Sequence, residues 1–154
     1  MKRLRSDSVA ATVTAALNAA KPDHEPPPHV SLSPEALKFW PAIMHARARD
    51  EWRTVDLVVA AQLAECQALI EQESNTLRRE GMIVMGGKSG ETPVENPRNR
   101  VVQTLAQREM ALMRTLVMGG EVGLGDKRNR AGARSAEHMA RQARADLEGE
   151  SLLA

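Results

Sequence analysis

The residues that most resemble a catalytic motif are Gly87-Lys88-Ser89, which match the last positions of a phosphate-binding P-loop. A P-loop also needs a glycine six positions before the lysine and a helix that starts directly after the motif. Met82 occupies that glycine position, and Thr92-Pro93 follows where the helix should begin. We therefore expect a hairpin tip whose glycines supply positive φ angles, and not a nucleotide site.

The other side chains capable of chemistry are too scattered to form a site. The single cysteine, Cys66, excludes an internal disulfide, and its place in an apolar helical stripe predicts a buried structural thiol. The histidines have no spacing suited to a metal site; they are His24, His29, His45 and His138. Nothing resembles a catalytic triad. The sequence therefore predicts a protein that is not an enzyme and that uses no metal or other cofactor.

Clusters of cationic residues remain as candidate binding sites. Arginine outnumbers lysine among the 21 cations, and its planar guanidinium suits phosphate. One cluster alone is more often a solvated surface, but repetition in an oligomer would give strong, salt-sensitive binding to nucleic acid. Only three residues are aromatic, which disfavours base stacking on single strands and favours duplex DNA. The candidate DNA-binding residues are Lys2, Arg3, Arg5, Lys38, Arg47, Arg49, Arg53, Lys127, Arg128, Arg130 and Arg134.

The scaffold for these residues is predicted between residues 55 and 119. Two apolar-striped helical patterns, at about 55–80 and 97–118, flank a glycine-rich insert that reads as a short β-hairpin. Gly81 is a suitable stop for the first helix, and Asn96-Pro97 a suitable start for the second. An antiparallel helical hairpin leaves apolar faces open, which favours self-association. The expected subunit interface comprises Leu63, Ile70, Leu77, Met110, Met113 and Val117.

The segment before this hairpin resembles a helix-turn-helix. Ser33-Pro34 is a strong helix start, with a serine N-cap and proline in the first turn. Apolar residues then recur at helical spacing to about Arg49, although Pro41 predicts a kink or a start shifted toward Trp40. A turn at 50–53 leads into the first long helix. The predicted fold class is all-α, with a helical hairpin at its centre.

Three segments are predicted along the 154 residues. Residues 1–29 form a basic N-terminal arm and a proline-rich linker, 30–120 the helical core and oligomerisation domain, and 121–154 a basic segment with a C-terminal helix and acidic tail. That last helix is expected to start at Ser135, after a mobile stretch rich in glycine and arginine. No apolar run is long enough for a membrane span or a signal peptide, so we expect a soluble intracellular protein.

The order of these features resembles the small terminase subunits of tailed bacteriophages. The likeness rests on Ala36-Leu37-Lys38-Phe39-Trp40, on Val55-Asp56 opening a helix with Leu63 and Cys66, on Gly81, on Asn96-Pro97-Arg98, and on Leu124-Gly125-Asp126-Lys127-Arg128. The resemblance implies a ring-shaped homo-oligomer, with a nonamer (about nine subunits) as the expected size. It also implies recognition of the packaging-initiation site on viral duplex DNA.

The same resemblance implies a partner and a location. The DNA would be delivered to the large terminase subunit, whose ATPase and nuclease the small subunit would regulate in the host cytoplasm, outside the mature virion. Family members often bind DNA through a helical N-terminal module, but the residues before Val30 are short and arm-like here. The location of the DNA surface therefore stays open among the three basic clusters.

Two alternatives share these features. A helix-turn-helix transcription regulator would carry similar basic clusters, but as a dimer on paired half-sites. A helical adaptor without affinity for DNA would also form an oligomer. Solution mass and a DNA titration at two salt concentrations separate these alternatives from the packaging role.

Overall fold

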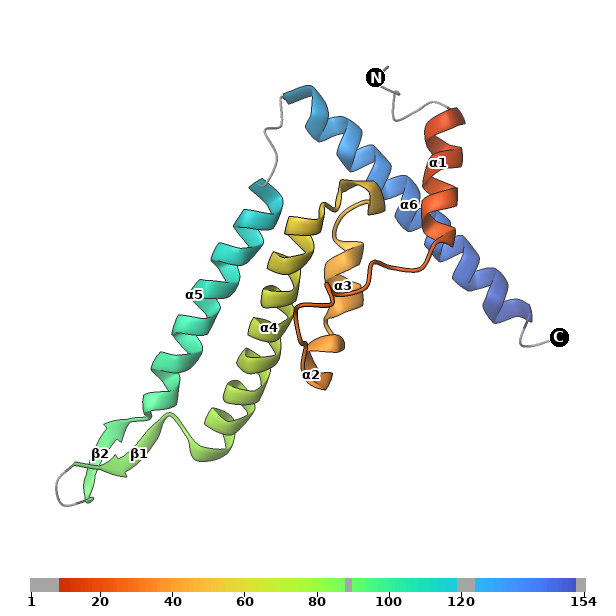
Figure 1. The fold of residues 1–154 in the computed structure, drawn as a ribbon. Coiled ribbons are helices and arrows are strands. Elements are labelled where there is room, and N and C mark those ends of the chain that lie inside the picture. The colour runs from red at the N-terminus through yellow and green to blue at the C-terminus, as the bar shows by residue number, and fades with distance from the viewer. Residues whose placement is uncertain (1–8, 88–89, 119–123, 152–154) are drawn as a thin grey trace. The chain divides into compact units, whose positions relative to one another are not determined.

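The computed structural model describes residues 9–87, 90–118 and 124–151, and it is mostly helical with a small two-stranded antiparallel sheet, as predicted (Figure 1). Its elements are α1 (Val9–Ala20), α2 (Pro34–Leu37), α3 (Trp40–His45), the 3-10 helix η1 (Arg49–Glu51), α4 (Thr54–Glu80), β1 (Ile83–Gly86), β2 (Thr92–Glu95), α5 (Pro97–Met118) and α6 (Leu124–Ser151). None of the described helices is long and apolar enough to cross a membrane.

The chain divides into two compact units. The hairpin unit comprises Pro26–Trp40 and Val55–Gly119, and the terminal unit comprises Met1–Glu25, Pro41–Thr54 and Gly120–Ala154. The hairpin unit therefore contains α2, most of α4, the sheet and α5. The terminal unit contains α1, most of α3, η1 and α6.

In the hairpin unit, α4 and α5 lie side by side and run antiparallel (Figure 1). The Sγ of Cys66 lies 3.3 Å from the carbonyl oxygen of Leu105, and a guanidinium nitrogen of Arg98 lies 2.6 Å from Glu73. A later residue of α4 therefore faces an earlier residue of α5, which shows that the two helices are antiparallel. α4 stops where the sequence predicted, because Gly81 has a φ of +87° and its N–H donates to the carbonyl of Leu77 at 2.8 Å.

The insert between the helices is a β-hairpin. Ile83 pairs with Glu95, and Gly86 pairs with Thr92 at the other end of the ladder. Gly87 and Gly90 have φ angles of +81° and +74°, so the prediction that glycines supply positive φ at this tip is confirmed. The two residues at positions 88 and 89 lie outside the described part of the chain.

The segment before α4 also follows its predicted capping. The Ser33 hydroxyl accepts a hydrogen bond from the N–H of Ala36 at 3.2 Å, and it donates to Glu65 on α4 at 3.1 Å. The apolar pattern is not one helix, however, because α2 ends at Leu37 and α3 begins at Trp40. The shifted start is therefore the right alternative, since Pro41 lacks an N–H and is tolerated only in a first turn.

In the terminal unit, α1 packs against α6, so helices from the two ends of the chain lie together (Figure 1). A guanidinium nitrogen of Arg144 donates to the carbonyl of Ala20 at 3.2 Å and satisfies a group at the end of α1. The predicted start of the last helix at Ser135 is wrong, because α6 begins at Leu124. Glycine at positions 125 and 132 weakens a helix by only about 1 kcal/mol each, so neither glycine prevents a helix that starts at Leu124.

Candidate functional site

Most of the basic residues predicted near the two ends of the chain lie outside the described residues, or have side chains that do. Lys2, Arg3 and Arg5 lie outside the described residues. The backbone of α6 includes positions 127, 128 and 130, but the side chains of Lys127, Arg128 and Arg130 are likewise outside the description. These six positions remain predictions as DNA contacts.

Arg47 belongs to the interior of the terminal unit. Its side chain is only 8% exposed, and its guanidinium carbon lies 4.9 Å from the ring centroid of Trp52 in a cation–π contact. It also donates a hydrogen bond to the carbonyl of Glu51 at 3.1 Å. A guanidinium held in this way supports the turn before α4, and we leave Arg47 out of the proposed DNA surface.

Arg49 and Arg134 link α6 to η1. The backbone N–H of Arg49 donates to a carboxylate oxygen of Glu137 at 3.0 Å, and its guanidinium donates to the carbonyl of Pro22. Arg134 donates to a carboxylate oxygen of Glu51 at 3.0 Å. Glu137 is 2% exposed and also pairs with Arg141 at 2.7 Å. These predicted DNA contacts are thus engaged by carboxylates and carbonyls of the chain itself.

Sequence reasoning missed the carboxylates that hold these arginines. Glu51 lies 83 positions before Arg134, and Glu137 lies 88 positions after Arg49. Their only local signal is the placement of Glu137 and Arg141 four residues apart on one helix, which is typical of an ion pair. The remaining predicted contacts, Lys38 and Arg53, are exposed.

Three more arginines are exposed on α5, a helix whose two apolar stripes predicted packing on the preceding helix and on a second subunit. They are Arg100, Arg108 and Arg114. The fourth arginine of α5, Arg98, instead bridges the helices by pairing with Glu73 at 2.6 Å and Glu80 at 2.9 Å. The signal available in the sequence was the recurrence of arginine along one helix with a single glutamate.

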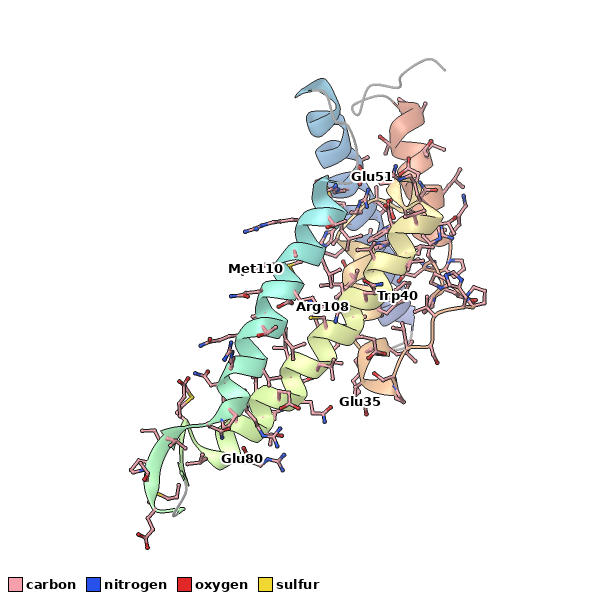
Figure 2. All side chains as sticks on the ribbon, turned by 60° about the vertical axis from the view of Figure 1, so that its left-hand side comes forward. Glu35, Trp40, Glu51, Glu80, Arg108 and Met110 are labelled. Atoms are coloured by element: carbon pink, nitrogen blue, oxygen red, sulfur yellow. The ribbon has the colours of Figure 1, made fainter. Side chains whose placement is uncertain are left out.

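The expected subunit interface divides between covered and open positions. Leu63 is 4% exposed, so almost none of its surface is open to solvent in the single chain. Ile70 and Leu77 are half-buried. Met110, labelled in Figure 2, is 50% exposed and Met113 is 43% exposed, both on α5. The side chain of Val117 lies outside the description.

Next to Leu77 the surface of the hairpin unit is hollowed. A shallow open groove forms where α4 ends, and its lining consists of Ser74, Leu77, Arg78, Gly81 and Met82. Met82 is 57% exposed, and the neighbouring strand exposes Ile83 and Met85. The hairpin unit therefore has apolar side chains open to solvent on α5 and at the base of the β-hairpin, in addition to Leu37, Val55 and Leu69 on α2 and α4.

Cys66 has the structural role that the sequence predicted. Its side chain is 2% exposed, and burial raises the pKa of the thiol above its ordinary value. A raised pKa lowers the fraction of reactive thiolate at neutral pH. Among the described residues, no group of three or more histidine, cysteine, aspartate or glutamate side chains is placed to hold a metal ion.

Two comparisons with known proteins bear on these surfaces. Residues 1–154 match the model of the Hendrixvirinae small terminase family. The chain is also 36% identical over 132 residues to the protein named "Terminase, small subunit" of Enterobacteria phage HK97, an alignment that covers 83% of this chain and 81% of that relative.

Proposed function

The chain belongs to the Hendrixvirinae small terminase family, which serves phage DNA packaging, and from this premise we propose that it works as a ring-shaped homo-oligomer on viral duplex DNA. In this role it recognises the packaging-initiation site and delivers the DNA to the large terminase subunit. It regulates the ATPase and nuclease of that subunit and contributes no catalytic residue of its own. It acts in the host cytoplasm and is not part of the mature virion.

The observation that carries self-association is the open methionine stripe on α5. Met110 and Met113 are 50% and 43% exposed, although they lie on a helix whose other apolar face is already packed on α4. Exposed apolar patches on a folded surface mark sites of interaction. A ring requires two different surfaces on each subunit, and the groove beside Leu77 and Met82 supplies a second apolar surface.

Duplex DNA is the partner that the charged residues support. Lys38 and Arg53 are exposed, and the basic residues at the two ends of the chain add to them. A ring repeats each cation once per subunit, so a modest number of contacts per chain becomes a large electrostatic term. The alternative, a helix-turn-helix transcription regulator, would bind paired half-sites as a dimer and would not require a ring.

The mass of the purified protein in solution tests this proposal first. Light scattering coupled to size exclusion is expected to give one narrow species of many subunits. Nine chains of 16.8 kDa would have a mass of about 151 kDa. A monomer would refute the ring, and a dimer would favour the transcription regulator.

A DNA titration then separates the packaging role from a helical adaptor. With six to ten phosphate contacts, affinity for duplex DNA is expected to fall by roughly 10³ to 10⁵ between about 50 and 200 mM salt. An oligomer of the expected mass that binds no duplex at low salt would support the adaptor instead.

A further inference from the structure

Besides Arg98, α5 carries three exposed cations, and one of them, Arg108, is close enough to Cys66 to lower the pKa of its thiol against the larger rise that burial causes. Arg100, Arg108 and Arg114 are exposed, and none of them forms a hydrogen bond or ion pair through its side chain with another described residue. This differs from Arg98 on the same helix, whose guanidinium contacts two carboxylates. The three arginines therefore have their charge available for a ligand.

Helix geometry places most of this charge on one face. At 100° per residue, Arg100, Gln103, Gln107 and Arg114 fall within an arc of about 60°, and Arg108 lies about 80° beyond the Arg100 edge of that arc. At 1.5 Å per residue, Arg100 and Arg114 are about 21 Å apart along the axis. We name the residues of the arc (Arg100, Gln103, Gln107 and Arg114) the α5 basic face, and all four are exposed.

No carboxylate of α5 neutralises this face. Glu109 is the one acidic residue in the helix, and it is half-buried toward α4, where it accepts a hydrogen bond from Gln67 at 3.0 Å. Between Arg100 and Arg114 the arc holds two glutamine amides, which are neutral donors. The α5 basic face is therefore a row of hydrogen-bond donors with a net positive charge.

We propose that the α5 basic face binds the phosphate backbone of duplex DNA. The proposal rests on the proposed function and adds a DNA contact that none of the predicted basic clusters included. Guanidinium groups bind phosphate oxygens in a bidentate manner, and amide N–H groups donate to the same oxygens. Duplex DNA carries one charge per about 1.7 Å of axis, so a row of about 21 Å lies beside roughly a dozen phosphates.

The composition of the face favours DNA over an acidic protein segment. Stable protein interfaces have an apolar or aromatic centre with polar residues around it. The arc from Arg100 to Arg114 itself holds no large apolar side chain, and Met110 lies about 20° beyond its Gln103 edge. Backbone contacts of this kind position DNA without reading its sequence, so the α5 basic face contributes affinity and leaves site recognition to other residues.

The test replaces two arginines and measures binding to DNA. The full chain carrying Arg100→Gln and Arg114→Gln is titrated into a fluorescent duplex of about 30 base pairs and arbitrary sequence, at about 50 and 200 mM salt. We expect at least roughly tenfold weaker binding at the lower salt, and a log–log salt slope shallower by about 2 or more. The lysine pair, Arg100→Lys with Arg114→Lys, retains the charge and is expected to keep most of the slope.

A matched control removes one charge from the other helix of the unit. Arg79 is exposed on α4, where it donates to the neutral hydroxyl of Thr76 at 3.2 Å. The variant Arg79→Gln is compared with the single variants Arg100→Gln and Arg114→Gln, and it is expected to bind DNA nearly as the wild type does. An equal loss in all three single variants would overturn the proposal, because it would show a general effect of charge.

The outcomes separate this proposal from the function on which it rests. If the wild type binds no duplex at low salt, the DNA-binding role itself fails. If the wild type binds duplex DNA and the α5 double variant has the same affinity and the same salt slope, the proposal that the α5 basic face binds DNA is overturned. The DNA-binding role of the protein would still stand. A synthetic peptide of residues 144–154, which carries the acidic tail, serves as the probe for an acidic protein segment. If the α5 double variant no longer binds this peptide but binds DNA as the wild type does, the proposal is overturned in favour of an acidic protein segment.

Light scattering on each variant shows whether assembly is unchanged. If the glutamine pair alters the mass, the single variants Arg100→Gln and Arg114→Gln decide the question at wild-type mass. Each is expected to reduce the salt slope by about 1. A wild-type slope in both single variants would overturn the proposal.

Discussion

Replacing both exposed methionines of α5 with glutamate is expected to break the oligomer into smaller species. The variant is Met110→Glu with Met113→Glu, in the full chain. The side chains at these positions are 50% and 43% exposed in the isolated chain, so about half of each remains to be buried by a second subunit. The open half of the stripe is the part that self-association would cover.

The size of the effect follows from those exposed fractions. Full burial of a methionine side chain stabilises by about 1.5–3 kcal/mol, so half of it contributes roughly 0.7–1.5 kcal/mol. Two such side chains give about 1.5–3 kcal/mol per contact between subunits. That corresponds to roughly 10- to 150-fold in the dissociation constant of one contact. Glutamate adds the cost of burying a charge, so these values are a lower bound.

The assay is light scattering over about a hundredfold range of protein concentration. The wild type is expected to keep one mass, whereas the double variant falls to lower mass on dilution. Thr104→Glu with Gln107→Glu adds the same charge at exposed positions of the same helix and should leave the mass unchanged. A methionine variant with wild-type mass at every concentration would refute the assignment of this stripe to the subunit contact.

Further predictions concern the stability of the hairpin unit. Ser33→Ala removes an N-cap and is expected to lower the free energy of unfolding in urea by about 1 kcal/mol, whereas no change would show that the cap is replaceable. Hydrogen bonds from Asn96 and Arg98 lower the pKa of Glu80 in the folded state, so the stability that Glu80 contributes is present above its ordinary value of 4.5 and lost as pH falls through the folded pKa. The difference in melting temperature between wild type and Arg98→Gln should therefore shrink below pH 4.5, and a constant difference would contradict this account. Burial raises the pKa of Cys66, so its alkylation at about pH 8 should be slower in the folded protein than in urea, and equal rates would contradict its burial.

Local capping explains why the long helices were predictable. Gly81 adopts the positive φ that ends a helix, and Asn96 caps α5 by accepting from the N–H of Arg98 at 3.0 Å. Each of these interactions joins residues close in sequence, so residue type alone indicates it. The family resemblance, which rested partly on these positions, is confirmed by the match over residues 1–154.

The basic clusters were harder to interpret, because charge in a sequence does not reveal what the charge contacts. Arg47 lies in a cluster that reads as surface, yet it packs on Trp52 and is 8% exposed. Arg134 is tied to Glu51 across 83 positions of sequence. In contrast, Arg100 and Arg114 lie on α5, whose apolar pattern predicted a packing role, and both side chains are exposed.

The sequence by itself determined the helical class, the bounds of α4 and α5, the hairpin glycines and the buried thiol, because each depends on backbone preferences or periodicity within a few residues. Only the tertiary structure decided which of the described arginines pair with carboxylates of the chain and which lie exposed on α5. It also decided that α6 starts at Leu124 and packs on α1. These outcomes depend on partners that are distant in the chain, and the free energy of such contacts is set by burial and geometry that arise only when the chain has folded.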